Sequence, residues 1–296
     1  MTGPVVVGLD GSPAGTSAAW WAAREAVERR LPLLLFHSWT TQPLDVPGAR
    51  EALGKQQYGG RALQRAETEL RHRYPGLTLT TELASSPAAE ALVDLSGTAA
   101  LVVLGSRGHG STASFLLGSI SLRVLGLARC PAVTVRAGDP AVENGWEHPA
   151  AVDHDEIVVG LKQPGPASDS LLEFAFTSAA SRAMGVRAVR ALPLSTLMPY
   201  PHTMAAGRAD SRYQAEERIR LTAALVPWRE KFPDIPVVEQ VSTGPASAVL
   251  LYAAAHSGLV VVGRRRHPSR LRWKLGPVAH AALHHAPCPV AVVPHD

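Results

Sequence analysis

The amino-acid sequence repeats itself at the length of a domain. VVVGLDGSPAGTSAAWWAAREA near the start is echoed by IVVGLKQPGPASDSLLEFAFTSA, which aligns Asp10 with Lys162. Further along, LVVLGSRGHGS and ARCPAVTVR match LVVVGRRRHPS and APCPVAVVP, which pairs Gly105 with Gly263 and Cys130 with Cys288. A unit of this length is a whole domain and too large for a solenoid repeat. The chain is therefore expected to hold two copies of one fold.

Each copy alternates short β-branched runs with helical patterns. In the first copy, strands are expected at residues 5–9, 33–37, 77–83, 101–105 and 132–135, with helices at 14–29, 60–73 and 120–128. Near-continuous apolar strands separated by helices indicate a parallel sheet covered on both faces. The predicted fold class is α/β, with two tandem doubly wound domains.

The segment AGDPAVENGWEHPAAVD, residues 137–153, lies between the copies and is rich in proline, glycine and acidic residues without periodicity. Such a composition is typical of a linker. We expect a first domain over residues 1–138, a linker over 139–153 and a second domain over 154–296.

Composition narrows the class of protein. No apolar run reaches membrane-spanning length and the start carries no signal-peptide pattern, so a cytoplasmic protein is expected. Cys130 and Cys288 lack CxxC spacing and are predicted to be free thiols. The formal net charge of +4 comes from one crowded segment, which a solvated loop explains better than a nucleic-acid site. That segment holds Arg264, Arg265, Arg266, Arg270, Arg272 and Lys274.

Glycines follow the fourth predicted strand of the first copy in the pattern G-x2-G-x9-G-S, formed by Gly105, Gly108, Gly118 and Ser119. Ligands of open parallel sheets bind beyond the carboxyl ends of the strands. Glycines let backbone N–H groups approach an anion, and a helix beginning at Gly118-Ser119 adds unpaired donors. The Ser119 hydroxyl could cap that helix or donate to phosphate. A purely structural turn is the alternative for the first glycines.

Other phosphate motifs are excluded. GxxxxGK[ST] is absent, so a Walker-type site is not expected. Residues 108–113, GHGSTA, fit the loose dinucleotide pattern, but the first acidic residue after Gly110 is Asp139 rather than a ribose ligand about 20 residues on. A nicotinamide cofactor is therefore not predicted.

The stretch GSRGHGSTASFLLGSISLRVLGLARCPAVTVR, together with VVVGLDGSPAG and HSW, resembles tandem universal stress proteins of the actinobacterial type across nearly the whole chain. The resemblance implies five parallel strands ordered 3-2-1-4-5 and two copies paired face to face as a pseudo-dimer through their last strands. It also implies ATP, with or without Mg²⁺, as the ligand. The implied ligand contacts are Gly8 and Asp10 beside the adenosine, the backbone of Ser38 at adenine, and Gly105, Ser106, Arg107, Gly108, Gly118 and Ser119 at ribose and phosphates. A turn or N-cap role before Ser12 is the alternative for Asp10.

The second copy departs from the pattern. It keeps Gly263 and Gly276, but Lys162, Arg266 and Pro277 replace Asp10, Gly108 and Ser119. Lysine accepts no hydrogen bond, proline has no N–H, and Arg266 would be strained if a positive φ were required there. One nucleotide per chain is therefore predicted, with a changed ligand at Gly263, Arg266 and Gly276 as the alternative.

Two further groups are weaker candidates for ligand sites. His280 and His284 have the i, i+4 spacing of a metal pair, but without a third ligand a solvated helix face is favoured. Trp20, Trp21 and Trp39 are predicted to be core or interface aromatics and not a stacking platform.

The functional prediction is an ATP-binding stress-response or regulatory protein that also forms a homo-oligomer of whole chains. No nucleophile–base pair or two-metal carboxylate cluster is recognisable, so catalysis is not implied. Three alternatives stay open: a slow ATPase, an adenine-nucleotide-dependent transferase or hydrolase, and an anion or nucleic-acid binder through the basic segment.

Overall fold

The computed structural model describes residues 3–40, 49–106, 117–139, 142–143, 156–193, 204–266 and 275–296. The first half runs β1 (Val5–Gly8), α1 (Pro13–Arg29), β2 (Leu33–Ser38), α2 (Ala49–Arg73), β3 (Leu79–Ala84), α3 (Ala88–Leu95), β4 (Leu101–Ser106), α4 (Ser119–Leu127) and β5 (Ala132–Arg136). The second half runs β6 (Glu156–Gly160), η1 (Pro166–Ser168), α6 (Asp169–Arg182), β7 (Gly185–Leu192), α7 (Met204–Lys231), β8 (Val237–Thr243), α8 (Ala246–Ala253), β9 (Leu259–Arg265), α9 (Pro277–His285) and β10 (Val290–His295).

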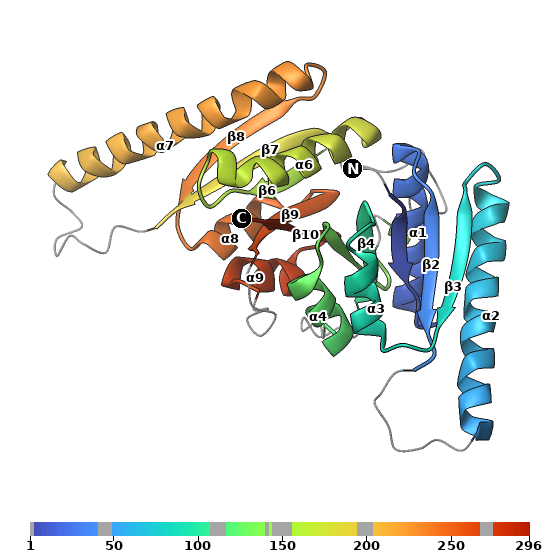
Figure 1. The fold of residues 1–296 in the computed structure, drawn as a ribbon. Helices are drawn as coiled ribbons and strands as arrows, with labels where there is room; N and C mark the ends of the chain where they lie inside the picture. The colour runs from blue at the N-terminus through green and yellow to red at the C-terminus, as the bar shows by residue number, and fades with distance from the viewer. Residues whose placement is uncertain are drawn as a thin grey trace.

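The strands of the two halves form one ten-stranded sheet, in the order β3-β2-β1-β4-β5-β10-β9-β6-β7-β8 (Figure 1). Within each half the neighbouring strands are parallel, which confirms the predicted order 3-2-1-4-5 in both copies. Strand order reverses between β1 and β4, so the carboxyl ends of these strands flank a crevice of the kind that binds ligands.

The two halves join through β5 and β10, which pair antiparallel. Val133 lies opposite Ala291, its own counterpart in the repeat, so a local pseudo-twofold axis passes between these residues. The predicted pseudo-dimer through the last strands is therefore confirmed, but the expected face-to-face packing is wrong. The halves meet edge to edge, because the unpaired edge of β5 finds its hydrogen-bonding partners in the edge of β10.

Helices cover both faces of this sheet, as predicted for apolar parallel strands. One core cluster places α1, α2, α6 and α7 on one face, with strand residues such as Val5, Leu35 and Val159. The other places α3, α4, α8 and α9 on the opposite face, with residues such as Val6 and Val102. Each cluster draws residues from both halves, so the core continues across the junction. Within the described part of the chain, no helix has both the length and the hydropathy that crossing a membrane demands.

The helix bounds differ from expectation in α2, which begins at Ala49 and not at residue 60. The helix runs straight through Gly59 and Gly60. A Cβ at Gly59 would lie 2.4 Å from Cδ2 of His37, so a glycine lets α2 lie directly against the end of β2. This glycine is a packing requirement within a helix.

Candidate functional site

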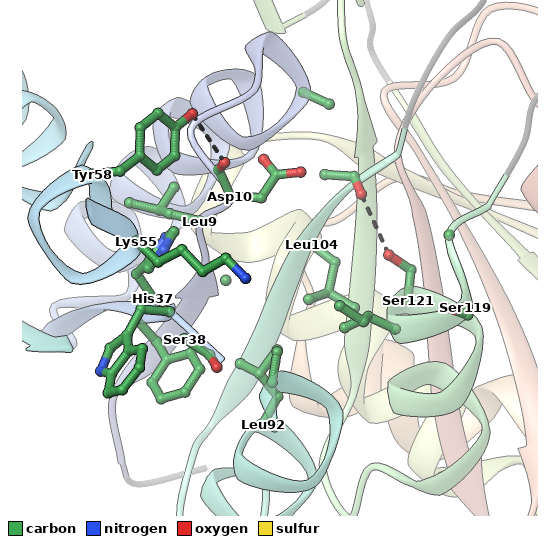
Figure 2. Close-up of a pocket in the computed structure, with 18 of the residues that line it drawn as sticks. Leu9, Asp10, His37, Ser38, Lys55, Tyr58, Leu92, Leu104, Ser119 and Ser121 are labelled. Atoms are coloured by element: carbon green, nitrogen blue, oxygen red, sulfur yellow. Dashed lines mark hydrogen bonds between the residues drawn. The ribbon is translucent and has the colours of Figure 1, made fainter. Parts of the chain in front are cut away.

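A cavity of about 970 Å³ opens at the carboxyl ends of β1, β2 and β4 in the first half (Figure 2). We call it the first-half cavity. Its floor is formed by the strand ends Gly8–Asp10, Phe36–Trp39 and Leu104–Gly105. Its walls come from Ala14 of α1, from Gly54, Lys55 and Tyr58 of α2, from Ala88 and Leu92 of α3, and from Leu117–Ser121 at the start of α4. The volume lies within the range of small-molecule and cofactor sites.

Asp10 lines the floor of the cavity and also shapes the turn that starts α1. Its Oδ1 accepts hydrogen bonds from the Ser12 backbone N (2.9 Å) and from Ser12 Oγ (2.5 Å). Ser12 in turn is the N-cap of α1 and accepts from the Gly15 backbone N at 3.2 Å. The turn role left open by the sequence is therefore present. Both of these hydrogen bonds use Oδ1, so Oδ2 takes no part in either of them.

Gly105 is required by the packing of β4 against α1. A Cβ there would lie 2.5 Å from the carbonyl carbon of Ala14 and 2.8 Å from the Gly15 backbone N. The absence of a side chain allows the first turn of α1 to lie against the end of β4. Ser106 is buried, and its hydroxyl donates to the Val135 carbonyl at 3.3 Å. Its side chain ties β4 to β5.

Helix α4 begins at the edge of the first-half cavity. Gly118 is its N-cap, with φ −64° and ψ 154°, and Ser119 is its first helical residue, so Ser119 does not have the capping position considered above. The first N–H groups of a helix have no partner inside it and carry the positive end of the helix dipole. Ser121 Oγ lies 3.5 Å from the Gly105 carbonyl, the contact marked in Figure 2. A Cβ at Gly118 would meet no atom of the described residues within 4 Å.

The end of β2 contributes three consecutive residues. Ser38 Oγ donates to the carbonyls of Ser86 (2.6 Å) and Thr40 (3.2 Å), so its side chain is used within the protein. His37 is buried, and burial lowers its pKa more than the Leu9 carbonyl and the Asp10 charge raise it. Trp39 is half-buried and lines the cavity, which corrects its assignment as a core or interface aromatic, whereas Trp21 is buried as predicted.

Helix α2 supplies two cavity residues that the sequence reasoning missed. Figure 2 shows Lys55 reaching from α2 into the middle of the first-half cavity, and Tyr58 pointing toward Asp10. The Tyr58 hydroxyl lies 3.5 Å from the Asp10 carbonyl oxygen. The i, i+3 spacing of Lys55 and Tyr58 indicates that both lie on one helix face. To place that face at the strand ends, the prediction would have had to include the first turns of α2, which lie before residue 60.

Two predicted ligand contacts, Arg107 and Gly108, lie outside the described residues. The other predicted residues of the first copy lie at the carboxyl ends of β1, β2 and β4 or at the start of α4. All of these except Ser106 line the cavity.

The equivalent corner of the second half is built differently. Lys162 is exposed, and α6 follows a short 3-10 turn in which Ser168 Oγ donates to the Gln163 carbonyl. A Cβ at Gly263 would meet the His295 ring at 2.9 Å and Leu171 Cδ2 at 3.1 Å. Side chains therefore occupy the space that the first turn of α1 fills at Gly105.

The predicted second anion site also changes in detail. Arg266 has no positive φ, so it bears no left-handed strain; its backbone N donates to the His295 carbonyl, and its side chain lies 3.5 Å from Asp296 Oδ1. Pro277 is the first residue of α9, after the N-cap Gly276. Arg264 is buried against the first half and is not part of an exposed basic loop. Arg270, Arg272 and Lys274 lie outside the described residues.

The histidine pair of α9 is stacked, with the ring centroids of His280 and His284 5.9 Å apart. Within the described ranges, no group of three or more His, Cys, Asp or Glu side chains is arranged to hold a metal ion. The pair therefore gains no third ligand from any described element.

Comparison with known proteins decides the family. The family model described as the universal stress protein family matches twice, at residues 1–136 and 154–294. The chain belongs to the universal stress protein family. It is 31% identical over 298 residues to universal stress protein Rv2005c of Mycobacterium tuberculosis, covering 97% of this chain and 96% of that protein. It is 30% identical over 297 residues to Rv2623 of the same organism, covering 97% and 95%.

A solved universal stress protein from Archaeoglobus fulgidus is similar in fold, with a TM-score of 0.68 at 15% identity. The match covers 99% of this chain and 98% of that one. This universal stress protein therefore shares its tandem architecture with full-length relatives.

Proposed function

We propose that this universal stress protein binds one adenine nucleotide, ATP, in the first-half cavity and responds to it as a regulatory stress protein. The observation that carries the proposal is the convergence of three groups on one concave site of about 970 Å³. These groups are the carboxylate of Asp10, the amino end of α4 at Gly118, and the Lys55 side chain. A carboxylate accepts from ribose hydroxyls, whereas a helix start and an ammonium group stabilise phosphate.

The described protein atoms do not explain Gly118. Its φ of −64° is open to any residue, and a Cβ would contact nothing within 4 Å among the described residues. Gly105, by contrast, is explained by the backbone of α1. A glycine without such a packing reason, at the rim of a cavity and at the start of a helix, supports close approach of a phosphate to the backbone.

The proposed stoichiometry of one nucleotide per chain has structural support in the second half. Pro277 removes one N–H from the start of α9, and Lys162 stands where the first half has Asp10. The Asp10–Ser12 turn is replaced by the 3-10 turn at Ser168. The groups proposed to recognise ribose and phosphate are thus altered on two elements.

A matched pair of variants tests the proposal. Gly118 and Gly276 are N-caps of equivalent helices, with φ/ψ of −64°/154° and −69°/163°, and at neither would an added Cβ meet a described atom within 4 Å. Isothermal titration calorimetry with ATP and Mg²⁺ should give one site in the wild type. Gly118→Ala should weaken binding about tenfold or more, because the added methyl group would keep the phosphate away from the backbone N–H groups, whereas Gly276→Ala should not.

Two results would contradict the proposal. Two equal sites, or equal weakening of binding by the two substitutions, would place nucleotide in both halves. Undetectable binding of ATP, ADP and AMP by the wild-type chain would remove the nucleotide function. Mass spectrometry of the protein isolated without added nucleotide would identify the natural ligand.

A further inference from the structure

A buried cluster of charged side chains joins α1 of the first half to α6 of the second. We call it the boundary cluster; it consists of Glu25, Glu28, Arg29, Ser178 and Arg182. Glu25 is fully buried and forms ion pairs with Arg29 of its own helix (2.6 Å) and with Arg182 of α6. Arg182 also reaches Glu28 at 3.2 Å, and Arg29 donates to Ser178 Oγ at 2.6 Å.

The boundary cluster is asymmetric in charge. Counting from the ends of α1 and α6, Glu25 and Ser178 occupy equivalent positions, as do Arg29 and Arg182. Within the cluster the carboxylates thus come only from α1, and Arg182 of the second half forms ion pairs with them. Burial alone would lower the pKa of Arg182, but the charges and hydrogen bonds of Glu25 and Glu28 raise it, so the guanidinium stays charged.

A second arginine crosses the boundary from β9. Arg264 is buried, and its Nη2 donates to the carbonyl of Ala128, the C-cap of α4. Burial lowers the pKa of Arg264 to about 10, which still leaves a cation at neutral pH. A cation at the carboxyl end of a helix is favourable because the helix dipole is negative there. The first half has Ser106 at the equivalent place in β4, which bonds within its own half.

Both contacts end on helices that form the first-half cavity. The first turn of α1 follows Asp10, contributes Ala14 to the lining and lies against Gly105. Helix α4 contributes Gly118, Ser119 and Ser121 at its other end. Its nine residues make a rigid rod of about 14 Å, so a fixed C-cap sets the direction of its amino end.

We infer that the second half is a positioning element for the nucleotide site of the first half, with Arg182 and Arg264 as its positioning residues. This inference rests on the proposed function. Arg182 holds α1, Arg264 holds α4, and the ligand binds between the amino ends of these helices. Because coupling is reciprocal, bound nucleotide must in turn stabilise the contact between the halves.

The test measures ATP affinity of full-length variants well below their unfolding temperatures. Arg264→Met and Arg182→Met should each raise the Kd for ATP about fivefold or more, the lower end of typical coupling between sites. Arg264→Lys, which keeps the charge, should restore part of the affinity. Arg190→Met is the matched control, because Arg190 pairs with the buried Glu217 at 2.9 Å wholly within the second half. It should lower stability and leave the Kd unchanged.

A second readout separates positioning from general stability. Hydrogen exchange of α6 in the wild type should slow when ATP binds, although α6 contributes no residue to the first-half cavity. If Arg182→Met does not fold, Ser178→Ala removes only the hydroxyl acceptor of Arg29 and should give a smaller rise in Kd.

The outcomes distinguish the two proposals. Wild-type protein that binds no nucleotide would remove the proposed function and this inference with it. Wild-type protein that binds ATP, while Arg182→Met and Arg264→Met bind it as tightly as Arg190→Met does, would overturn this inference alone. Unchanged exchange of α6 on binding would also count against it.

Discussion

Arg29 and Arg182 are the last residues of equivalent helices, and each guanidinium crosses the boundary to the other half of the chain. Arg29 lies over the Phe174 ring, 5.1 Å from its centroid, and Arg182 lies over the Trp21 ring at 4.8 Å. Both helices then end in a left-handed residue, Arg30 or Ala183. The duplicated chain thus keeps the isologous interface of a symmetric dimer within one polypeptide.

This pairing predicts unequal losses of stability. Arg182→Met leaves Glu25 and Glu28 without a shared partner, and breaking a buried ion pair by removing one member costs about 3–5 kcal/mol. Arg29→Met should cost less, because Arg182 still neutralises Glu25. Urea unfolding followed by circular dichroism gives the comparison. Arg212→Met, which breaks an exposed pair with Glu216, should change the free energy of unfolding by less than about 1 kcal/mol. Equal losses in all three variants would contradict the burial argument.

The glycines at the ends of β4 and β9 should differ in their tolerance of alanine. At Gly105 an added Cβ would press on the backbone of Ala14 and Gly15, which cannot rotate away. We therefore expect Gly105→Ala to lower the free energy of unfolding by about 1–3 kcal/mol. At Gly263 the nearest atoms belong to the side chains of His295 and Leu171, which can shift, so Gly263→Ala should cost less. Thermal unfolding of both variants checks the order, and a larger loss for Gly263→Ala would refute it.

The two thiols should be unreactive in the native protein. Cys130 and Cys288 are buried, as free thiols, and burial raises the pKa of each to about 12. Only about one thiol in ten thousand is then ionised at pH 8, and the thiolate is the reactive form. Ellman's reagent should label neither cysteine in native protein and both in guanidinium chloride. Rapid labelling of native protein that disappears in Cys130→Ala or Cys288→Ala would show that residue to be accessible.

The repeat made most of the fold predictable, because apolar strand runs recur in the same order in both copies and indicate a parallel sheet. The glycine pattern likewise placed Gly105, Gly118 and Asp10 near one another through the strand-end rule. These inferences depend on local patterns. Each copy carries its own strand runs, whereas the full glycine pattern occurs only in the first copy.

Features that depend on contacts between distant residues could not be predicted from the sequence. Lys55 and Tyr58 reach the first-half cavity only because Gly59 lets α2 continue past His37, and a glycine pair within a helix carries no sign of such packing. Arg182 and Glu25 pair across the boundary, yet each looks like an ordinary charged residue at a helix surface. Arg264 sits in a run of three arginines, which hides that one of them is buried.

His37 should make stability depend on pH in a defined direction. The side chain is 5% exposed, and among the described residues its Nδ1 has no hydrogen-bond partner. Burial lowers its pKa from the ordinary value of 6.5, against smaller opposing effects of Leu9 and Asp10. The unfolded chain therefore binds the proton more readily than the folded one. The contribution of the neutral His37 ring to the free energy of unfolding is fully present above pH 6.5. It is lost as the pH falls from 6.5 toward the pKa of His37 in the folded state.

The loss from one such group cannot exceed about 1.4 kcal/mol per pH unit. Urea unfolding of the wild type and of His37→Gln should be measured from about pH 7.5 down to about pH 5. The comparison isolates the loss caused by protonation of His37, because the other histidines are common to both proteins. The difference between the two free energies should shrink as the pH falls. If the difference stayed constant across this pH range, protonation of His37 would be no harder in the folded state than in the unfolded chain, and the cavity around it would have to admit water to the ring.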